Sequence, residues 1–329
     1  MIMPGLFFRD WVARTILIRN PRRRIVHPFP PLASFIDLIR LAKQEDLGTG
    51  SVTGDVTSEL TVAENLIGVG TLFQKAVGVA CGLPIVEHVC RLFDERLRVE
   101  MIPGFHLELI EGRFSDHKLT PMLQIRGPIR SLLAAERTML NFVQRMSGVA
   151  TLTNRYVRRV ENTRAKICDT RKTLPGYRAL DKYAVRVGGG TNHRAGLFDM
   201  VLVKDNHIAQ LDRHEWGSQL EKVVALSRQK NPKLPIEIEV VDFAGFERVL
   251  AMDAVDIILL DNMDCPTMRR CVEARDATGM RSRLQLEASG GVTLETVHDI
   301  ALTGVERISV GALTHSVPAL DISLEIEVQ

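Results

Sequence analysis

The chain has 329 residues, of which 45% are hydrophobic and 25% charged, a composition typical of a globular protein with one large or two ordinary domains. The net charge is only +2 and the few aromatic residues are not interleaved with basic ones, which argues against a nucleic-acid-binding surface. No apolar run approaches the roughly 20 residues that a membrane span requires. The five scattered cysteines favour a reducing compartment, so we expect a cytoplasmic protein.

Residues 1–33 predict a flexible basic arm. Residues 1–30 contain six arginines, no lysine and one acidic residue, and they end in a proline cluster. One interpretation is an amphipathic targeting segment, although serine is absent and no clear cleavage signal follows. A disordered arm and an over-extended start site are the alternatives.

The chain that follows the arm predicts an α+β module. The apolar spacing from Phe35 to Leu41 indicates an amphipathic helix, and residues 84–93 indicate a second one. Residues 66–80 and 97–126 alternate apolar and polar side chains between turn signals, which predicts antiparallel strands. Residues 128–161 predict a long helix in which Gly148 is a candidate break point.

A different pattern of predicted secondary structure begins near residue 165. Short apolar runs end repeatedly in polar residues, and helix-like segments (217–229, 244–252, 266–278 and 294–302) separate most of them. The runs are 165–170, 200–204, 235–240, 256–261, 284–289 and 307–311. This alternation indicates parallel βαβ units, and six of them predict a complete or partial barrel, with an open doubly wound sheet as the alternative. In a barrel the chemistry lies at the carboxyl ends of the strands, where the polar residues fall.

Cations cluster in the loops between residues 168 and 207, beside Gly, Pro and Asn. They are Arg171, Lys172, His193, Arg194, Lys204 and His207. Several convergent cations with few acids beside them predict a pocket for a small, multiply anionic substrate. Schiff-base chemistry at Lys172 or Lys204 is a competing hypothesis, but one amine requires one lysine, whereas arginine suits carboxylate or phosphate recognition.

Carboxylates and glycines complete the candidate site. Glu237 and Glu239 share one face of a predicted strand, while Asp261 and Glu287 lie late in the next two. Several acids facing one interior require a metal or cations from neighbouring strands, and a buried ion-pair network is the alternative to a ligand site. The loops at 289–291 and 311–312 place glycine after the last two strands, where barrels often hold phosphate.

At these residues the sequence resembles the quinolinate phosphoribosyltransferase family. The resemblance rests on EDLGTGSVTGDVTSELT, AERTMLNFVQRMSGVAT, IEIEVVDF, ILLDNM, LEASGGV, ISVGALTHSVPALDISL and the stretch from DTRKTLPGYRALDKY to VLVKDNHI. It covers about residues 34–327, with Val187 where the family pattern suggests Cys. It implies a type II phosphoribosyltransferase-like fold, in which an α/β sandwich (34–139 with 316–329) joins an incomplete parallel α/β barrel (140–315).

The resemblance also implies an activity in de novo NAD biosynthesis. Quinolinate and phosphoribosyl pyrophosphate would give nicotinate mononucleotide, pyrophosphate and carbon dioxide, with Mg²⁺ required. The active site would lie between two subunits, so a homodimer is expected, and a hexamer remains open. No membrane or nucleic-acid partner is expected.

Individual roles follow from the same resemblance. Arg171, Lys172, His193 and Arg194 would cradle the two quinolinate carboxylates, joined by Arg137 from the partner subunit. The expected catalytic residues are Lys172, Lys204, Glu239 and Asp261: both lysines would face substrate and pyrophosphate, and both acids the ribose hydroxyls and Mg²⁺, directly or through water. The expected 5′-phosphate site consists of Ser289, Gly290, Gly311 and His315.

Other readings stay open at this point. A related enzyme could act on a different substrate, a silent paralogue could serve only as a scaffold, and a nucleotide-binding sensor could lack turnover. The sequence also leaves open whether His207, Glu237 and Glu287 contact a ligand.

Overall fold

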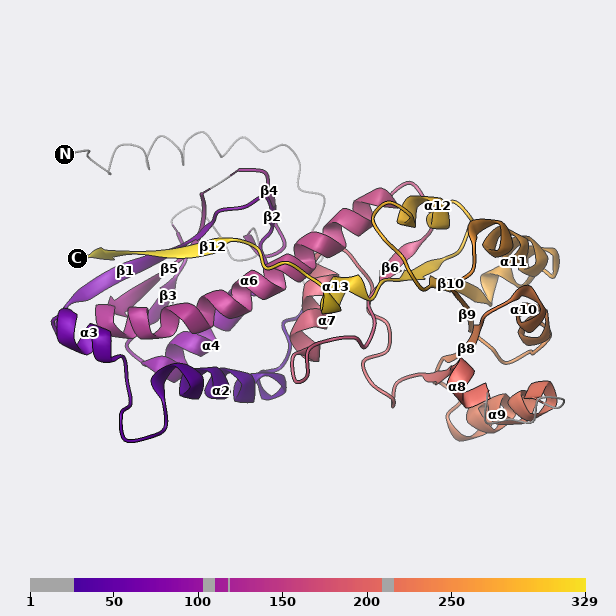
Figure 1. The fold of residues 1–329 in the computed structure, drawn as a ribbon, viewed down its shortest axis with the longest axis horizontal. Helices are drawn as coiled ribbons and strands as arrows, with labels where there is room; N and C mark the ends of the chain where they lie inside the picture. Colours follow the sequence, from indigo (N-terminus) through magenta and orange to yellow (C-terminus); the bar gives the residue numbers. More distant parts are fainter. Residues whose placement is uncertain (1–26, 103–109, 118, 209–215) are drawn as a thin grey trace.

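The computed structural model describes residues 27–102, 110–117, 119–208 and 216–329, which build two main sheets connected by one long helix (Figure 1). One sheet has four antiparallel strands and the other has six parallel strands. The predicted α/β fold class, a sandwich domain joined to an incomplete barrel, is confirmed. Within the described parts of the chain, no helix is both long and apolar enough to cross a membrane.

The first domain is built on the four-stranded sheet, whose strand order is β12-β1-β5-β3. The alternating segments form antiparallel strands as predicted, and the C-terminal strand returns to pair with β1. The elements are η1 (Leu32–Ser34), α2 (Ile36–Leu47), α3 (Val56–Thr61), β1 (Ile67–Gln74), β2 (Gly78–Val79), α4 (Leu83–Phe93), β3 (Arg98–Glu100), β4 (Phe114–Ser115), β5 (Thr120–Pro128) and β12 (Ile322–Val328). Strands β2 and β4 form a separate small sheet.

The second domain contains all six predicted parallel strands. Their order, β6-β11-β10-β9-β8-β7, is the cyclic order of a barrel that lacks only the closing contact between β6 and β7. This order supports the barrel over the open doubly wound sheet. The strands are β6 (Lys166–Cys168), β7 (Val201–Val203), β8 (Ile236–Val240), β9 (Ile257–Asp261), β10 (Gln285–Ser289) and β11 (Arg307–Ser309).

Helices cover the barrel sheet between these strands (Figure 1). They are α7 (Arg178–Val187), α8 (Asp205–Ile208), α9 (Trp216–Lys230), α10 (Phe243–Leu250), α11 (Cys265–Ala277), η2 (Met280–Ser282), α12 (Val297–Ala301) and α13 (Ala312–His315). The four helices expected between the later strands are present. Buried aliphatic side chains of the parallel strands, such as Ile238, Ile258 and Leu286, pack toward these helices, while polar side chains occupy alternate positions.

The long helix α6 (Ile129–Arg159) runs unbroken through Gly148. The glycine therefore does not divide the helix, and its role is a close approach. A Cβ atom at Gly148 would lie 2.3 Å from the carbonyl oxygen of Pro318, in the segment that carries the chain back to the first sheet (Figure 1). The missing side chain lets the returning segment lie directly on the helix.

The ends of the predicted domains are only partly described. Residues 1–26 of the expected basic arm lie outside the described residues, but the ring of Phe29 packs 4.8 Å from that of Tyr183 on α7. The expected boundary between residues 139 and 140 falls inside α6, which packs against elements of both domains. The domain limits therefore stay a prediction.

We expect Gly148→Ala to lower the thermal unfolding midpoint. Alanine favours a helix interior over glycine by roughly 1 kcal/mol, but the clash with Pro318 opposes this gain, and overpacking costs about 1–3 kcal/mol. Gly217→Ala in α9 is the matched control, because a Cβ there meets no atom of the described residues within 4 Å. Its midpoint should stay level or rise. An unchanged or raised midpoint for Gly148→Ala would contradict the close approach.

Candidate active site

A cavity of 710 Å³ opens at the carboxyl ends of the parallel strands. Each of the six strands contributes to its wall, either through the loop that follows it or, for β8, through Glu239 near its end, as a barrel site requires. Eleven of the predicted site residues line it: Arg171, Lys172, His193, Arg194, Lys204, Glu239, Asp261, Ser289, Gly290, Gly311 and His315. Residues that are far apart in the sequence therefore meet at one site.

Of the four remaining candidates, only Glu287 lines the cavity. Arg137 is exposed on α6 and does not line the cavity of its own chain. His207 accepts the backbone N–H of Lys204 at Nδ1, 3.0 Å away, and so holds its own loop. Glu287 reaches the cavity wall, whereas Glu237 is fully buried beneath it.

One side of the cavity carries cations without acidic partners. Arg171, Lys172 and Arg194 form no ion pair with any described residue. The Nε atom of Arg171 is buried and has no hydrogen-bond partner in the described part of the chain. Burial, and next the nearby charge of Arg171, lower the pKa of Arg194. Two like charges that line one cavity and influence each other in this way are stabilised by an anion bound beside them.

The loop that presents Arg194 is fixed by Asp169, which follows strand β6 and is completely buried. Its carboxylate accepts hydrogen bonds from Lys182 Nζ at 2.6 Å, from Asn192 Nδ2 at 2.6 Å and from the N–H of His193 at 2.8 Å. Lys182 also donates to the carbonyl oxygen of His193, 2.9 Å away. The loop 192–194 is thus tied to both the strand and helix α7.

The acids on the opposite side are partly paired. Lys204 Nζ lies 2.5 Å from the carboxylate of Glu239, and Asp261 accepts the side-chain N–H of Asn262 at 2.7 Å. Glu239 and Asp261 end neighbouring strands and both line the cavity. These carboxylate oxygens are of the kind that Mg²⁺ prefers, together with substrate phosphates, so the residues present fit such an ion.

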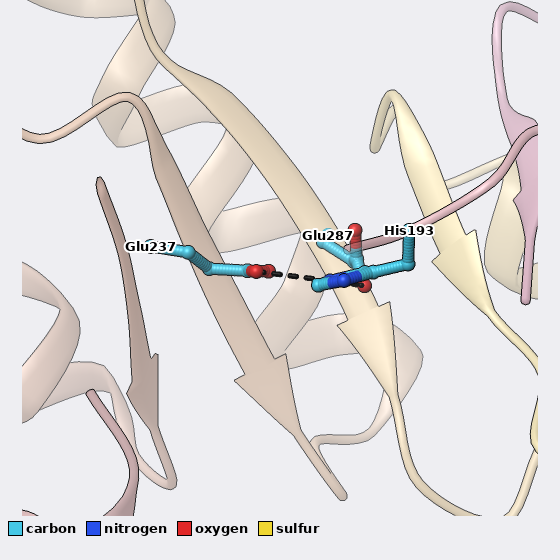
Figure 2. Close-up of side chains that lie close together, drawn as sticks. All are labelled: His193, Glu237 and Glu287. Atoms are coloured by element: carbon cyan, nitrogen blue, oxygen red, sulfur yellow. Dashed lines mark ion pairs between the residues drawn. The ribbon is translucent and has the colours of Figure 1, made fainter. Parts of the chain in front are cut away.

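Charged side chains form a buried layer next to the cavity: His193 and Glu287 line it, and Glu237 is fully buried. Figure 2 shows how these side chains lie together. His193 Nε2 lies 2.9 Å from Glu237 and 3.3 Å from Glu287, and Arg307 Nε lies 2.5 Å from the other oxygen of Glu287. The three residues His193, Glu237 and Glu287 are spaced closely enough to hold a metal ion. Because Glu287 is already paired with Arg307, we interpret His193, Glu237 and Glu287 as a buried ion-pair network, which was the alternative to a ligand site.

The protonation of His193 follows from its two nitrogens. Burial lowers its pKa, but the contacts with Glu237 and Glu287 outweigh burial and raise the pKa to about 9. The N–H of Arg194 lies 2.7 Å from Nδ1 and can donate to it only while Nδ1 is unprotonated, so this hydrogen bond lowers the pKa of the ring. The geometry therefore assigns a single proton to Nε2, which faces the glutamates.

The glycine loops form the far end of the cavity. Gly290 and Gly291 have φ angles of +91° and +59°, which favour glycine, and a Cβ at Gly290 would collide with the side chain of Asn262. A Cβ at Gly311 would meet the His315 ring at 3.1 Å and the Lys172 side chain at 3.2 Å. Backbone and cations therefore approach one another closely here.

Sequence reasoning missed the residues that hold the catalytic groups from behind. Thr314 donates its hydroxyl to the carbonyl oxygen of Lys172 at 2.8 Å, and Arg145 donates to the carbonyl oxygen of Thr314 at 2.8 Å and to Asp181 at 3.0 Å. Arg307 was overlooked in the same way. Each stands beside another polar residue (Gln144, His315 and Glu306), so no local contrast in the sequence marks them.

The fold and the site together define a two-domain protein whose incomplete barrel carries a cation-lined cavity at its strand ends. Residues 55–147 match the family model for the N-terminal domain of quinolinate phosphoribosyl transferase, and residues 149–325 match the model for its C-terminal domain. The chain therefore belongs to the quinolinate phosphoribosyltransferase family.

Individual relatives agree with this family. A nicotinate-nucleotide pyrophosphorylase (carboxylating) of Mycobacterium leprae is 42% identical over 88% of this chain and 96% of its own. A mitochondrial quinolinate phosphoribosyltransferase (decarboxylating) of Nicotiana tabacum is 37% identical over 95% of this chain and 89% of its own. The crystal structure of NadC from Streptococcus pyogenes superposes with a TM-score of 0.80 at 32% identity, covering 92% of this chain and all of that one.

Proposed function

We propose that the chain catalyses the reaction after which its family is named. Quinolinate and phosphoribosyl pyrophosphate are converted to nicotinate mononucleotide, pyrophosphate and carbon dioxide, which is a decarboxylating pentosyl transfer in NAD biosynthesis. The observation that carries this proposal is the group of three cations that line the cavity, Arg171, Lys172 and Arg194, none of which forms an ion pair with a described residue. A ligand with two adjacent carboxylates supplies the negative charge that this group lacks.

In this proposal Arg171, Lys172 and Arg194 bind the two carboxylates of quinolinate. The resemblance also gives His193 a direct contact with the carboxylates, and Arg137 of the partner subunit would close the pocket. The exposure of Arg137 on α6 supports a role outside its own chain. Two guanidinium groups favour the diacid over nicotinate, because a monoacid would leave one half-buried cation unpaired.

The phosphoribosyl group would lie along the rest of the cavity. Ser289, Gly290, Gly311 and His315 would hold the 5′-phosphate, since glycine allows backbone N–H groups to approach phosphate oxygens. Lys172 and Lys204 would contact the pyrophosphate. Glu239 and Asp261 would face the ribose hydroxyls and hold Mg²⁺, directly or through water.

The protein's part in the reaction is binding, orientation and charge stabilisation. When bound, Mg²⁺ would neutralise the pyrophosphate leaving group. Glu239 and Asp261 stabilise the positive charge that develops on the ribose as pyrophosphate departs. The carboxylate clamp holds the pyridine nitrogen in line with C1, so attack requires little further ordering. The resulting pyridinium stabilises the electron pair that stays on the ring carbon when carbon dioxide departs, and a proton from solvent then takes the place of the carboxylate. No covalent enzyme intermediate is needed.

The assembly and location are also proposals. A homodimer with a shared active site follows from the role given to Arg137, and a hexamer would be built from such dimers. A cytoplasmic location is supported by the five cysteines, all of which are free thiols. The relative from Nicotiana tabacum is named mitochondrial, so residues 1–26 are the segment whose removal or retention in cells would test the location.

The activity itself is tested by mixing the purified protein with quinolinate, phosphoribosyl pyrophosphate and Mg²⁺. We expect nicotinate mononucleotide and carbon dioxide in a one-to-one ratio, and no product when nicotinate replaces quinolinate, because the clamp fits a diacid. Product analysis by liquid chromatography and ¹⁴C release from the 2-carboxylate would measure both. Ligand-induced thermal stabilisation without product would point instead to a binding protein.

The carboxylate clamp predicts selective losses of affinity. Arg171→Ala and Arg194→Ala should each raise the Kd for quinolinate about tenfold or more, because each removes a charge-assisted pair, and should leave the Kd for phosphoribosyl pyrophosphate within about twofold. Isothermal titration measures both constants. Arg281→Ala, on an exposed side chain of η2, is the control and should change neither. Equal losses for the two substrates would show that the clamp is assigned to the wrong ligand.

A shared site predicts complementation between two inactive variants. Arg137→Ala damages the site of the partner, whereas Lys172→Ala damages the barrel of its own chain. In a mixed dimer one site combines an intact barrel with an intact Arg137, so refolding equal amounts together should restore about a quarter of wild-type activity by random pairing. Steady-state assays of the mixture and of each variant alone measure this. Absence of any recovery would argue against Arg137 acting across the interface.

A further inference from the structure

His193 has no ring nitrogen left for a ligand. Nε2 faces the carboxylates of Glu237 and Glu287 at 2.9 and 3.3 Å, and Nδ1 accepts the backbone N–H of Arg194 at 2.7 Å. An imidazole has only these two polar atoms. The side chain lines the cavity, yet it is only 7% exposed and offers the cavity mainly its ring carbons.

The glutamate side of this arrangement is fixed by the barrel. Glu237 lies on β8 and Glu287 on β10, and both are fully buried. Apart from the contact with His193, neither oxygen of Glu237 has a hydrogen-bond partner among the residues that the structure describes. Glu287 is held by Arg307 on β11. Rigid strands thus determine where the ring can lie (Figure 2).

The backbone side of the arrangement controls Arg194. The N–H of His193 donates to Asp169, its carbonyl oxygen accepts from Lys182, and the next N–H, that of Arg194, donates to the ring. Three consecutive polar groups of the main chain are therefore bound by buried side chains. Because these bonds fix the peptide planes on both sides of the His193 Cα, they also set the direction in which Arg194 leaves the main chain.

We propose that His193 is a positioning residue: with Glu237 and Glu287 behind it, its Nδ1 atom holds the backbone of Arg194 so that the guanidinium group meets the substrate carboxylates. The role rests on the proposed function, since it presupposes that Arg194 binds quinolinate. It differs from direct carboxylate binding by His193, because the ring acts through Arg194 alone. A buried ion network that costs solvation energy is thereby used to orient one side chain.

Two near-isosteric variants separate the two nitrogens. In His193→Asn the amide oxygen can take the place of Nδ1 and accept the N–H of Arg194, but the contact with the glutamates is lost. In His193→Gln the amide reaches toward the glutamates, but the acceptor at Nδ1 is lost. Each variant is made in the wild-type chain and in Arg194→Ala, with His298→Asn on α12 as the control. The Kd for quinolinate, the Kd for phosphoribosyl pyrophosphate and the thermal midpoint are measured for all.

We expect His193→Gln to raise the Kd for quinolinate about tenfold, and His193→Asn less than about threefold, with the Kd for phosphoribosyl pyrophosphate unchanged. In the Arg194→Ala chain neither variant should raise the Kd for quinolinate by more than a further factor of about two, because the residue that His193 positions is gone. The control should match the wild type. A midpoint close to that of the wild type shows that the losses are not due to unfolding.

Other outcomes would overturn the proposal. If the His193 variants raise the Kd for quinolinate by the same factor in the Arg194→Ala chain as in the wild type, the ring binds the ligand directly. If His193→Gln binds quinolinate tightly and His193→Asn binds it weakly, the hydrogen bond at Nδ1 is irrelevant. If Arg194→Ala alone leaves the Kd for quinolinate unchanged, or if the wild-type chain does not bind quinolinate, the proposed carboxylate clamp fails, and the positioning role fails with it.

Discussion

The buried carboxylate of Asp169 holds the active site together. It sits at the end of β6 and accepts three hydrogen bonds from the helix and loop that follow, two of them from side chains and one from the main chain. A fully buried carboxylate is tolerated only when its oxygens are paired in this way. Lys182 supplies the neutralising charge, so strand β6, helix α7 and the loop with Arg194 form one unit. The cations of the cavity depend on that unit for their placement.

The charges around the cavity are arranged in two layers. The lower layer is paired: Glu287 with Arg307, and the ring of His193 between the two glutamates. The upper layer is unequal, because Glu239 pairs with Lys204 whereas Arg171, Lys172 and Arg194 form no ion pair in the described chain. The paired layer prevents the acids of the barrel from neutralising these cations. Positive charge therefore accumulates on one wall and stays available for an anionic ligand.

Much of this architecture was predictable from the sequence because it depends on local periodicity. The six apolar runs with polar ends became parallel strands, and the cations and glycines between them met at one cavity because parallel strands end at the same edge. The unbroken course of α6 was not predictable. Gly148 matches a helix break by propensity, and only the carbonyl group of Pro318, 170 residues later, explains its presence. Support from Arg145 and Thr314 was hidden for the same reason, since it depends on contacts between distant segments.

The fixed placement of Arg171 and Arg194 bears directly on selectivity. A flexible pair of arginines could turn toward solvent when only one carboxylate is present, and a monoacid would then bind almost as well as a diacid. Here the backbone of Arg194 is bound on both sides of His193, and the Nε atom of Arg171 is buried without a partner. Both arginines are half-buried, so each regains only part of its hydration when a ligand fails to pair with it. The penalty for an unpaired guanidinium is therefore retained, and discrimination between a diacid and a monoacid follows from the rigidity of the loop as much as from its charge.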